Sequence, residues 1–446
     1  MKKQLAILAC KAASLVGRWL GKGSSMPGKV ALKICPDILA RLSLPENVVA
    51  VTGSNGKTTT VELLVAALEK NGKTVCWNKE GANQIEGVAT MLLRYADLRG
   101  RVRCDMVVME SDEQYARHTF AFLKPSLFAV LNLYRDQMTR NGHPEYIYDR
   151  IAEAISPEMD LFLNADDPLT ACLSSLGRNT TWFGVAEGVL EEEKGVYDDG
   201  KYCPCCGGEM EYAYRQFATF GNFACQHCDY ERDKPDFEAV SYDEESGNFT
   251  VSGRAEATLH TGLKTPYSLY NMLAAFSLAV MLGVDPHGAA QALSSHRLKS
   301  GRAQRWNVGG KDIMLLTSKH ENSVSYDRSL SLAAKRGGKV LVMVDAISRK
   351  YFTGETSWLW DINFNKLNVP EVEHIVLAGQ YACDLAERFS FTDIPQEKIS
   401  LMRDLDRLPE LFDDRADQPL TVVTCFSDRD KFIRRLPAEA QREEIA

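Results

Sequence analysis

The feature that most constrains this chain is a glycine-containing loop between a short apolar run and an amphipathic segment. The loop reads Gly53-Ser54-Asn55-Gly56-Lys57-Thr58-Thr59 and follows Val48–Val51, an unbroken apolar run that predicts a buried parallel strand. Apolar residues then recur at helical spacing as far as Asn71, and Gly72 provides a stop signal. Backbone N–H groups in such a loop, at a helix N-terminus, surround phosphate oxygens. We therefore expect all seven loop residues to bind a nucleotide phosphate.

The spacing within the loop is shorter than the commonest form. A G-x-x-x-x-G-K loop would need glycine at position 51, where Val51 stands, so the pattern is G-x-x-G-K-T. In this pattern Lys57 can reach the β- and γ-phosphates and the Thr58 hydroxyl can ligate Mg²⁺. A purely structural turn is the alternative, and the strand before the loop and the helix after it favour the phosphate site.

Acidic residues follow several of the predicted strands. Glu110 ends the apolar run Met106–Met109, and Asp136 follows Leu127–Leu131. Ligands of parallel sheets bind at the carboxyl ends of the strands, and Mg²⁺ prefers oxygen ligands. We expect Glu110 to bind the metal, with Asp136 as a second candidate. The segment 164–167 (Asn-Ala-Asp-Asp) predicts either an Asx-type turn or a nucleotide contact.

The length of 446 residues and the alternation of strands and helices predict an α/β protein of several domains. We expect a helical lead-in over 1–45, a parallel-sheet ATP-binding domain over 46–300 and a smaller α/β domain over 301–446. Composition changes near residue 200, which predicts a module inserted over 200–235. Further strands are expected near Ile313–Leu316, Lys339–Val344, His374–Ala378 and Leu420–Thr424, and a further helix over Tyr270–Leu282.

The composition is that of a globular protein, with 45% hydrophobic and 25% charged residues. A net charge of −8 argues against binding of nucleic acid or an anionic membrane by overall charge alone. The N-terminus resembles a signal sequence, but Lys11 and Arg18 interrupt its apolar run, so we expect an amphipathic helix. No run approaches the ~20 apolar residues of a membrane span. Scattered single cysteines suit a reducing compartment, which predicts a cytoplasmic protein.

Two C-x-x-C pairs lie in the predicted insertion. Cys203 and Cys206 form the first pair, Cys225 and Cys228 the second, and 18 residues separate them. This spacing is typical of a four-thiolate structural zinc site. Cys205 is then a spare thiol, and His227 is a weaker competing ligand. No strand–helix unit of the α/β type is expected to run through 203–228, and the insertion is predicted to be a zinc ribbon.

Several of these motifs together resemble those of Mur ligases. The residues that carry the resemblance are the loop over 52–60, the segment 164–167, Tyr270–Ala275 and Gly301-Arg302, in that order. Within this superfamily the chain resembles the MurT family over essentially its whole length. That resemblance rests on Gly21–Gly23 with Pro27–Lys29, Leu133–Met138, the four-cysteine insertion and Ser357–Asp361.

The resemblance implies the ligase subunit of lipid II isoglutaminyl synthase. Such a subunit would use ATP and Mg²⁺ to phosphorylate the α-carboxylate of D-glutamate in the peptidoglycan stem peptide at the inner membrane face. A GatD-type glutaminase partner would supply ammonia, giving D-isoglutamine. By position, Lys57, Thr58 and Glu110 would serve the phosphates and Mg²⁺, Asn271 would contact adenine and Arg302 would lie near the nucleotide. Either Asp361 or Glu355 would complete the partner's catalytic site.

Some segments depart from the family pattern. Gln137 stands where Mur ligases have a metal-binding histidine, as it generally does in MurT proteins, and Thr139 stands where MurT proteins usually have an acid. Lys319–Ser323 replaces Lys-Asn-Pro-x-Gly, and Asp345–Lys350 replaces an Asn/Asp-rich turn. Alternatives are therefore a Mur-like ligase with another carboxylate acceptor, a ligase that adds an amino acid like folylpolyglutamate synthase, and an ATP-binding scaffold for a glutaminase.

Overall fold

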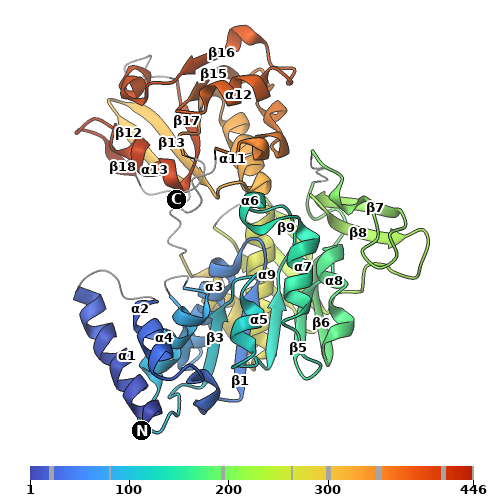
Figure 1. The fold of residues 1–446 in the computed structure, drawn as a ribbon. Coiled ribbons are helices and arrows are strands. Elements are labelled where there is room, and N and C mark those ends of the chain that lie inside the picture. The colour runs from blue at the N-terminus through green and yellow to red at the C-terminus, as the bar shows by residue number, and fades with distance from the viewer. Residues whose placement is uncertain are drawn as a thin grey trace. The chain divides into compact units, whose positions relative to one another are not determined.

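The computed structural model describes residues 1–19, 25–79, 82–191, 196–262, 265–297, 303–346, 354–412 and 418–443. The chain forms two compact units (Figure 1). Unit 1 comprises Met1–Tyr134, His143–Lys194 and Asp198–Leu298, and unit 2 comprises Arg135–Gly142, Gly195–Tyr197 and Lys299–Ala446. The short segment 135–142, which follows a strand of the first sheet, therefore groups with the C-terminal unit.

Unit 1 is built on a nine-stranded sheet with the order β11-β10-β9-β6-β5-β4-β1-β3-β2. The seven strands from β9 to β2 run parallel, and β10 and β11 are antiparallel additions at one edge. The bounds are β1 (Asn47–Thr52), β2 (Val75–Trp77), β3 (Met106–Glu110), β4 (Leu127–Val130), β5 (Asp160–Asn164), β6 (Asn179–Val185), β9 (Phe237–Asp243), β10 (Asn248–Gly253) and β11 (Ala257–His260). The α/β class and the strands expected at β1, β3, β4 and β5 are confirmed.

Helices cover both faces of this sheet, as the near-continuous burial of its central strands requires. Alternate strand residues such as Ala50, Met109 and Val130 pack with α1 (Lys2–Trp19), α2 (Met26–Ile34) and α4 (Ile85–Tyr95) in one core cluster. On the other face α3 (Lys57–Lys70), α9 (Pro266–Met281) and α10 (Pro286–Ser294) pack on one another. The remaining helical segments of unit 1 are α5 (Ala116–Phe120), α7 (Pro144–Ala152), α8 (Pro168–Ala171), η1 (Leu39–Arg41), η2 (Ser174–Leu176) and η3 (Asp199–Lys201).

The cysteine-rich segment contains a two-stranded antiparallel sheet. Its strands are β7 (Met210–Phe217) and β8 (Phe220–Cys225). Within 203–228 the structure has this hairpin and no strand–helix unit, in agreement with the expected ribbon insertion. Aromatic residues give these strands a buried side: Phe223 packs with Met210, Cys203 and Ala171 in a small core of its own.

Unit 2 is a second α/β layer with the strand order β16-β15-β14-β17-β13-β12-β18. Its first five strands run parallel, and β12 and β18 add antiparallel. The strands are β12 (Ala303–Val308), β13 (Lys311–Ser318), β14 (Gly338–Met343), β15 (Val372–Ala378), β16 (Ile399–Met402), β17 (Leu420–Cys425) and β18 (Gln441–Glu443). The strands expected at β13, β14, β15 and β17 are confirmed.

Two apolar clusters, one on each face, hold the sheet of unit 2 between its helices. Tyr326, Trp358 and Phe389 lie in one cluster and Leu408 and Phe432 in the other. The helical segments are α6 (Met138–Asn141), α11 (Ser323–Arg336), α12 (Ala382–Phe389), α13 (Phe426–Ile433), η4 (Ser357–Asp361), η5 (Phe364–Leu367), η6 (Gln396–Lys398) and η7 (Leu405–Leu411).

Among the described residues, no helix combines the length and the apolar character that a membrane crossing requires.

Candidate active site

The glycine loop connects the carboxyl end of β1 to the first turn of α3, as its sequence predicts. Gly53 and Gly56 both have positive φ, 144° and 83°, and Gly56 immediately precedes the helix. A Cβ atom at Gly56 would lie 2.1 Å from the Asn271 side-chain oxygen. Position 56 therefore requires glycine for its backbone conformation and for the close approach of α9.

Neighbouring strand ends hold the loop in shape. The Ser54 hydroxyl donates to the carbonyl of Tyr134 (3.0 Å) and accepts from its N–H (3.1 Å). The Asn55 N–H donates to the Asn132 side chain (2.8 Å), whose amide donates back to the Asn55 carbonyl (3.1 Å). These contacts fix the loop before any ligand arrives, which lowers the entropy cost of binding.

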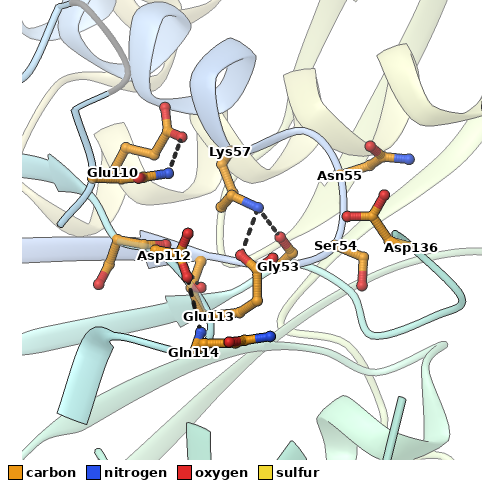
Figure 2. A network of polar contacts seen from close by, with 12 residues as sticks. Gly53, Ser54, Asn55, Lys57, Glu110, Asp112, Glu113, Gln114 and Asp136 are labelled. Carbon is orange, nitrogen blue, oxygen red and sulfur yellow. Dashed lines mark hydrogen bonds and ion pairs between the residues drawn. The ribbon is translucent and has the colours of Figure 1, made fainter. Parts of the chain in front are cut away.

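Lys57 is buried and lies inside its own loop. Its ammonium donates to the Gly53 carbonyl and forms an ion pair with Glu113 at 2.9 Å. Figure 2 shows the side chain directed across the loop toward both groups. Glu113 is also buried, so the pair is largely shielded from water. No spacing rule links Glu113 to a lysine 56 positions earlier, so the amino-acid sequence alone does not identify this partner.

Glu110, at the end of β3, meets the first turn of α3. One carboxylate oxygen accepts from the Thr58 hydroxyl (2.7 Å) and the other from the Asn83 amide (3.0 Å). The backbone of Glu110 is tied in both directions to the side chain of Asn78. The structure thus brings Thr58 and Glu110 together. Their oxygens are of the kind that Mg²⁺ takes in nucleotide sites.

Asn271 lies on α9 beside the loop. Its side-chain oxygen accepts from the Thr60 hydroxyl at 3.4 Å and contacts Gly56. The residue is half-buried rather than engaged in the apolar core, so its amide can serve the loop or a ligand. Arg302, the other residue expected near the nucleotide, lies outside the described residues.

The Asn-Ala-Asp-Asp segment forms a turn in the protein interior. The Asn164 side chain accepts from the Asp166 N–H, and Asp167 caps α8 and accepts from the Leu133 N–H. Asp166 binds Arg232 and Tyr270. Burial raises the pKa of Asp166, and it raises the pKa of Asp167 to about 6. These contacts favour the turn interpretation over direct nucleotide contact.

Asp136 belongs to unit 2, in the segment that the fold separates from the first sheet. One of its oxygens pairs with the Lys319 ammonium, and the other accepts from the Asn322 amide (2.9 Å). The backbone of Gln137, with φ at 48°, donates to the Glu321 carbonyl (3.0 Å). The departing segment 319–323 is therefore bonded to 135–137, and both Asp136 oxygens are already engaged within unit 2.

The four predicted cysteine ligands converge. All four Sγ atoms lie within 4.8 Å of one another, with Cys203 3.8 Å from Cys228 and Cys206 3.5 Å from Cys225. A tetrahedral site with Zn–S bonds of ~2.3 Å has S···S edges of about 3.8 Å, so the donor set fits zinc. Cys205 points elsewhere: its sulfur lies 3.3 Å from that of Cys172.

The two acids expected to serve a partner enzyme have different surroundings in unit 2. Asp361 ends η4 and is mostly buried, 3.4 Å from the Arg135 guanidinium. Glu355 is exposed and accepts from the Ser357 N–H (2.7 Å), a contact that lowers its pKa. Asp361 is thus held by an ion pair, while Glu355 caps its own turn. The departing residues Ile347–Lys350 lie outside the described residues.

A phosphate loop on a parallel sheet, followed by a second α/β unit, is the arrangement of a nucleotide-binding α/β protein. Residues 51–201 match the Mur ligase middle domain and residues 320–428 match the MurT ligase C-terminal domain. Among solved structures, the fold is similar to that of a pseudomurein peptide ligase type C from Methanothermus fervidus (TM-score 0.68, 18% identity, 90% of this chain and 80% of that chain) and to MurF from Acinetobacter baumannii (TM-score 0.65, 19% identity, 92% and 80%).

Relatives that are similar over nearly the whole chain identify the family more closely. The chain is 30% identical to the lipid II isoglutaminyl synthase (glutamine-hydrolyzing) subunit MurT of Streptococcus pneumoniae, over 99% of this chain and 98% of that protein. It is 28% identical to the same subunit of Staphylococcus aureus, over 90% of this chain and 89% of that protein. The chain belongs to the MurT family of Mur ligases. It is a ligase that forms C–N bonds, and membership in a family of named subunits implies a partner.

Proposed function

We propose that this chain is the ligase subunit of a lipid II isoglutaminyl synthase, converting the D-glutamate of the peptidoglycan stem peptide to D-isoglutamine in the cytoplasm. The observation that carries the proposal is the loop around Lys57. A buried ammonium and a Thr58–Glu110 pair lie at the carboxyl edge of a parallel sheet, in a chain that matches MurT proteins end to end. This is the constellation that phosphoryl transfer from ATP requires.

In this proposal Lys57 changes partners when ATP binds. Its ammonium rests on Gly53 and Glu113, and the β/γ-phosphates would offer stronger, doubly charged acceptors. Thr58 and Glu110 would hold Mg²⁺, which neutralises charge on the phosphates. The N-terminus of α3 would bind the phosphate oxygens. Asn271 would contact the adenine side of the nucleotide, and Arg302 would lie near it.

The chemistry has two steps that balance. A carboxylate oxygen of D-glutamate attacks the γ-phosphorus of ATP, and the bond between the γ-phosphorus and the oxygen of the β-phosphate breaks. ADP departs, and the product is an acyl phosphate. Ammonia then attacks the acyl carbon, loses a proton, and displaces inorganic phosphate to leave the amide. The loop serves the first step by positioning and charge stabilisation rather than by covalent chemistry.

The ammonia would come from a glutaminase of the GatD type. Of the two candidate acids in unit 2, we assign Asp361 to orient the partner's catalytic histidine, because Arg135 holds its carboxylate in place. Glu355 already accepts from its own backbone and is exposed. The four-cysteine cluster would hold a structural zinc ion, since a closed set of four thiolates has no open position for chemistry.

The deciding experiment is an amidation assay on lipid II with ATP, glutamine and the glutaminase partner, followed by mass spectrometry of the product. The proposal expects amidated stem peptide that requires all three additions. Phosphate release with no amidated product would refute the isoglutaminyl assignment in favour of another carboxylate acceptor. Absence of both ATP hydrolysis and product, with glutaminase activity retained, would favour a nucleotide-binding scaffold.

A further inference from the structure

The N-terminal helix α1 has two apolar faces. One face packs on the protein: Ala6, Ile7 and Cys10 are fully buried, and Ser14 and Gly17 continue the same line. This side meets α2 and α4 within unit 1, and Figure 1 shows α1 at one edge of that unit. The packing fixes the rotation of the helix about its axis, and therefore fixes which side chains face outward.

The outward face is a continuous apolar stripe. Leu5, Leu8, Leu15 and Val16 have 57%, 51%, 59% and 57% of their surface exposed, and Ala12 is exposed between them. At 100° per residue these positions fall within a sector about 100° wide. The stripe spans residues 5–16 of this 18-residue helix, a rise of about 17 Å. Single exposed leucines are common on proteins, but a contiguous stripe with a polar rim marks an interaction surface.

The charge around the stripe has one sign. The first acidic residue of the chain is Asp37, and residues 1–36 contain seven lysines or arginines. Because the whole chain carries −8, the remaining residues carry −15. Lys2 and Lys11 lie about 90° to either side of the stripe on the helix. On α2, Lys29 and Lys33 are exposed as well.

A neighbouring loop adds to this basic region. Lys3 donates to the Arg99 carbonyl at 2.7 Å, which joins the first turn of α1 to residues 98–103. That loop carries the exposed side chains of Arg99 and Arg101, with Leu98 51% exposed beside them. These arginines add positive charge near the first turn of α1, but Lys3 lies on the buried side of the helix, so the loop does not extend the apolar stripe.

We propose that α1 lies in the plane of an anionic membrane surface, with its outer stripe in the acyl boundary and its lysines at the headgroups. A long apolar stripe with a basic rim and no acidic residue is the pattern of interfacial helices. A second copy of this chain is a poorer occupant, since a symmetric contact would bring two basic helices together. The net charge of the whole chain does not reveal this basic surface, because the excess of acidic residues after residue 36 outweighs it.

The proposal stands independently of the proposed function, because vesicle binding needs neither ATP nor lipid II. The test is co-sedimentation of the full chain with vesicles of phosphatidylglycerol or of phosphatidylcholine. We expect binding to the anionic vesicles, weakening as salt rises, and little binding to the neutral ones. Absence of binding to phosphatidylglycerol vesicles at low salt would overturn the proposal.

Variants distinguish vesicle binding through α1 from non-specific adsorption of the protein to vesicles. Leu8→Glu with Leu15→Glu should weaken binding to anionic vesicles at least tenfold, and Lys2→Gln with Lys11→Gln should reduce both the affinity and its salt dependence. The matched control is Leu401→Glu, because Leu401 is 49% exposed on β16 of unit 2. Unchanged Mg-ATP-induced thermal shifts would show that the variants are folded.

Two outcomes would assign the stripe elsewhere. If Leu8→Glu with Leu15→Glu leaves vesicle binding unchanged, the membrane proposal fails. If the same variant abolishes association with the glutaminase subunit while vesicle binding persists, the stripe is a protein interface. If the wild-type protein binds vesicles but shows no amidation activity, the proposed function fails and the membrane proposal for α1 stands.

Discussion

Glu113→Gln removes the negative charge that lies 2.9 Å from the Lys57 ammonium while keeping the size of the side chain. The two side chains are only 2% and 10% exposed, so water can replace little of the lost interaction. Breaking a buried pair by changing one partner costs about 3–5 kcal/mol. The glutamine carbonyl can still accept an N–H, so we expect the free energy of unfolding to fall by about 3 kcal/mol, the lower end of this range.

This loss of unfolding free energy corresponds to a decrease in melting temperature. Unit 1 comprises roughly 290 residues, for which the unfolding entropy is about 0.6 kcal/mol/K. A loss of about 3 kcal/mol therefore lowers the melting temperature of unit 1 by about 5 °C. Saturating Mg-ATP should narrow this gap, because the phosphates supply the negative charge that the variant lacks. The assay is a thermal unfolding scan with and without Mg-ATP.

Two comparisons make this prediction specific. Lys57→Met combined with Glu113→Leu removes both charges and should melt closer to wild type than Glu113→Gln does. Glu410→Gln disrupts an exposed pair with Arg407, whose N···O distance is similar at 2.8 Å, and should leave the melting temperature unchanged. If Glu113→Gln melts like wild type, the buried pair does not hold Lys57, and the partner exchange proposed for ATP binding loses its basis.

Three further predictions test the loop, the cysteines and the buried turn. Gly56→Ala should abolish ATP binding measured by calorimetry, whereas Gly72→Ala, at a similar φ of 80° with open space around it, should retain it. Elemental analysis of the wild-type protein should give one zinc ion per chain; Cys206→Ser should lose it, whereas Cys205→Ser should keep it, and zinc retained in both would refute the ligand set. Because the pKa of Asp167 is raised to about 6 in the folded state, its carboxylate costs stability as pH rises from about 4 to 6. Asp167→Asn should remove about 3 kcal/mol of that pH dependence, and a thermal-melt profile identical to wild type would contradict it.

Local patterns predicted much of the fold and part of the site. The apolar run before Gly53, the helical periodicity after it and the paired cysteines are each contained within a few dozen residues, and each appears in the structure as expected. Glu110 lies beside Thr58, as expected of a carboxylate at the end of a neighbouring buried strand, and its role as a metal ligand stays a prediction.

Long-range pairing accounts for what the sequence did not predict. The Lys57–Glu113 pair joins residues on different elements, and no periodicity signals it. Asp136 follows a strand of the first sheet, yet its oxygens are bonded to Lys319 and Asn322 of unit 2. The strands of the β7–β8 hairpin were not predicted, because they lack a clear alternation and pack against distant residues such as Ala171 and Tyr270.

The most direct test of the central claim follows an oxygen atom. Lipid II whose D-glutamate α-carboxylate carries ¹⁸O is incubated with the ligase, its glutaminase partner, ATP and glutamine, and the released phosphate is examined by mass spectrometry. An acyl-phosphate route transfers one carboxylate oxygen to each phosphate formed with the amide, so we predict singly labelled phosphate, and none with Lys57→Ala. Amidated product accompanied by unlabelled phosphate would contradict carboxylate activation at this site.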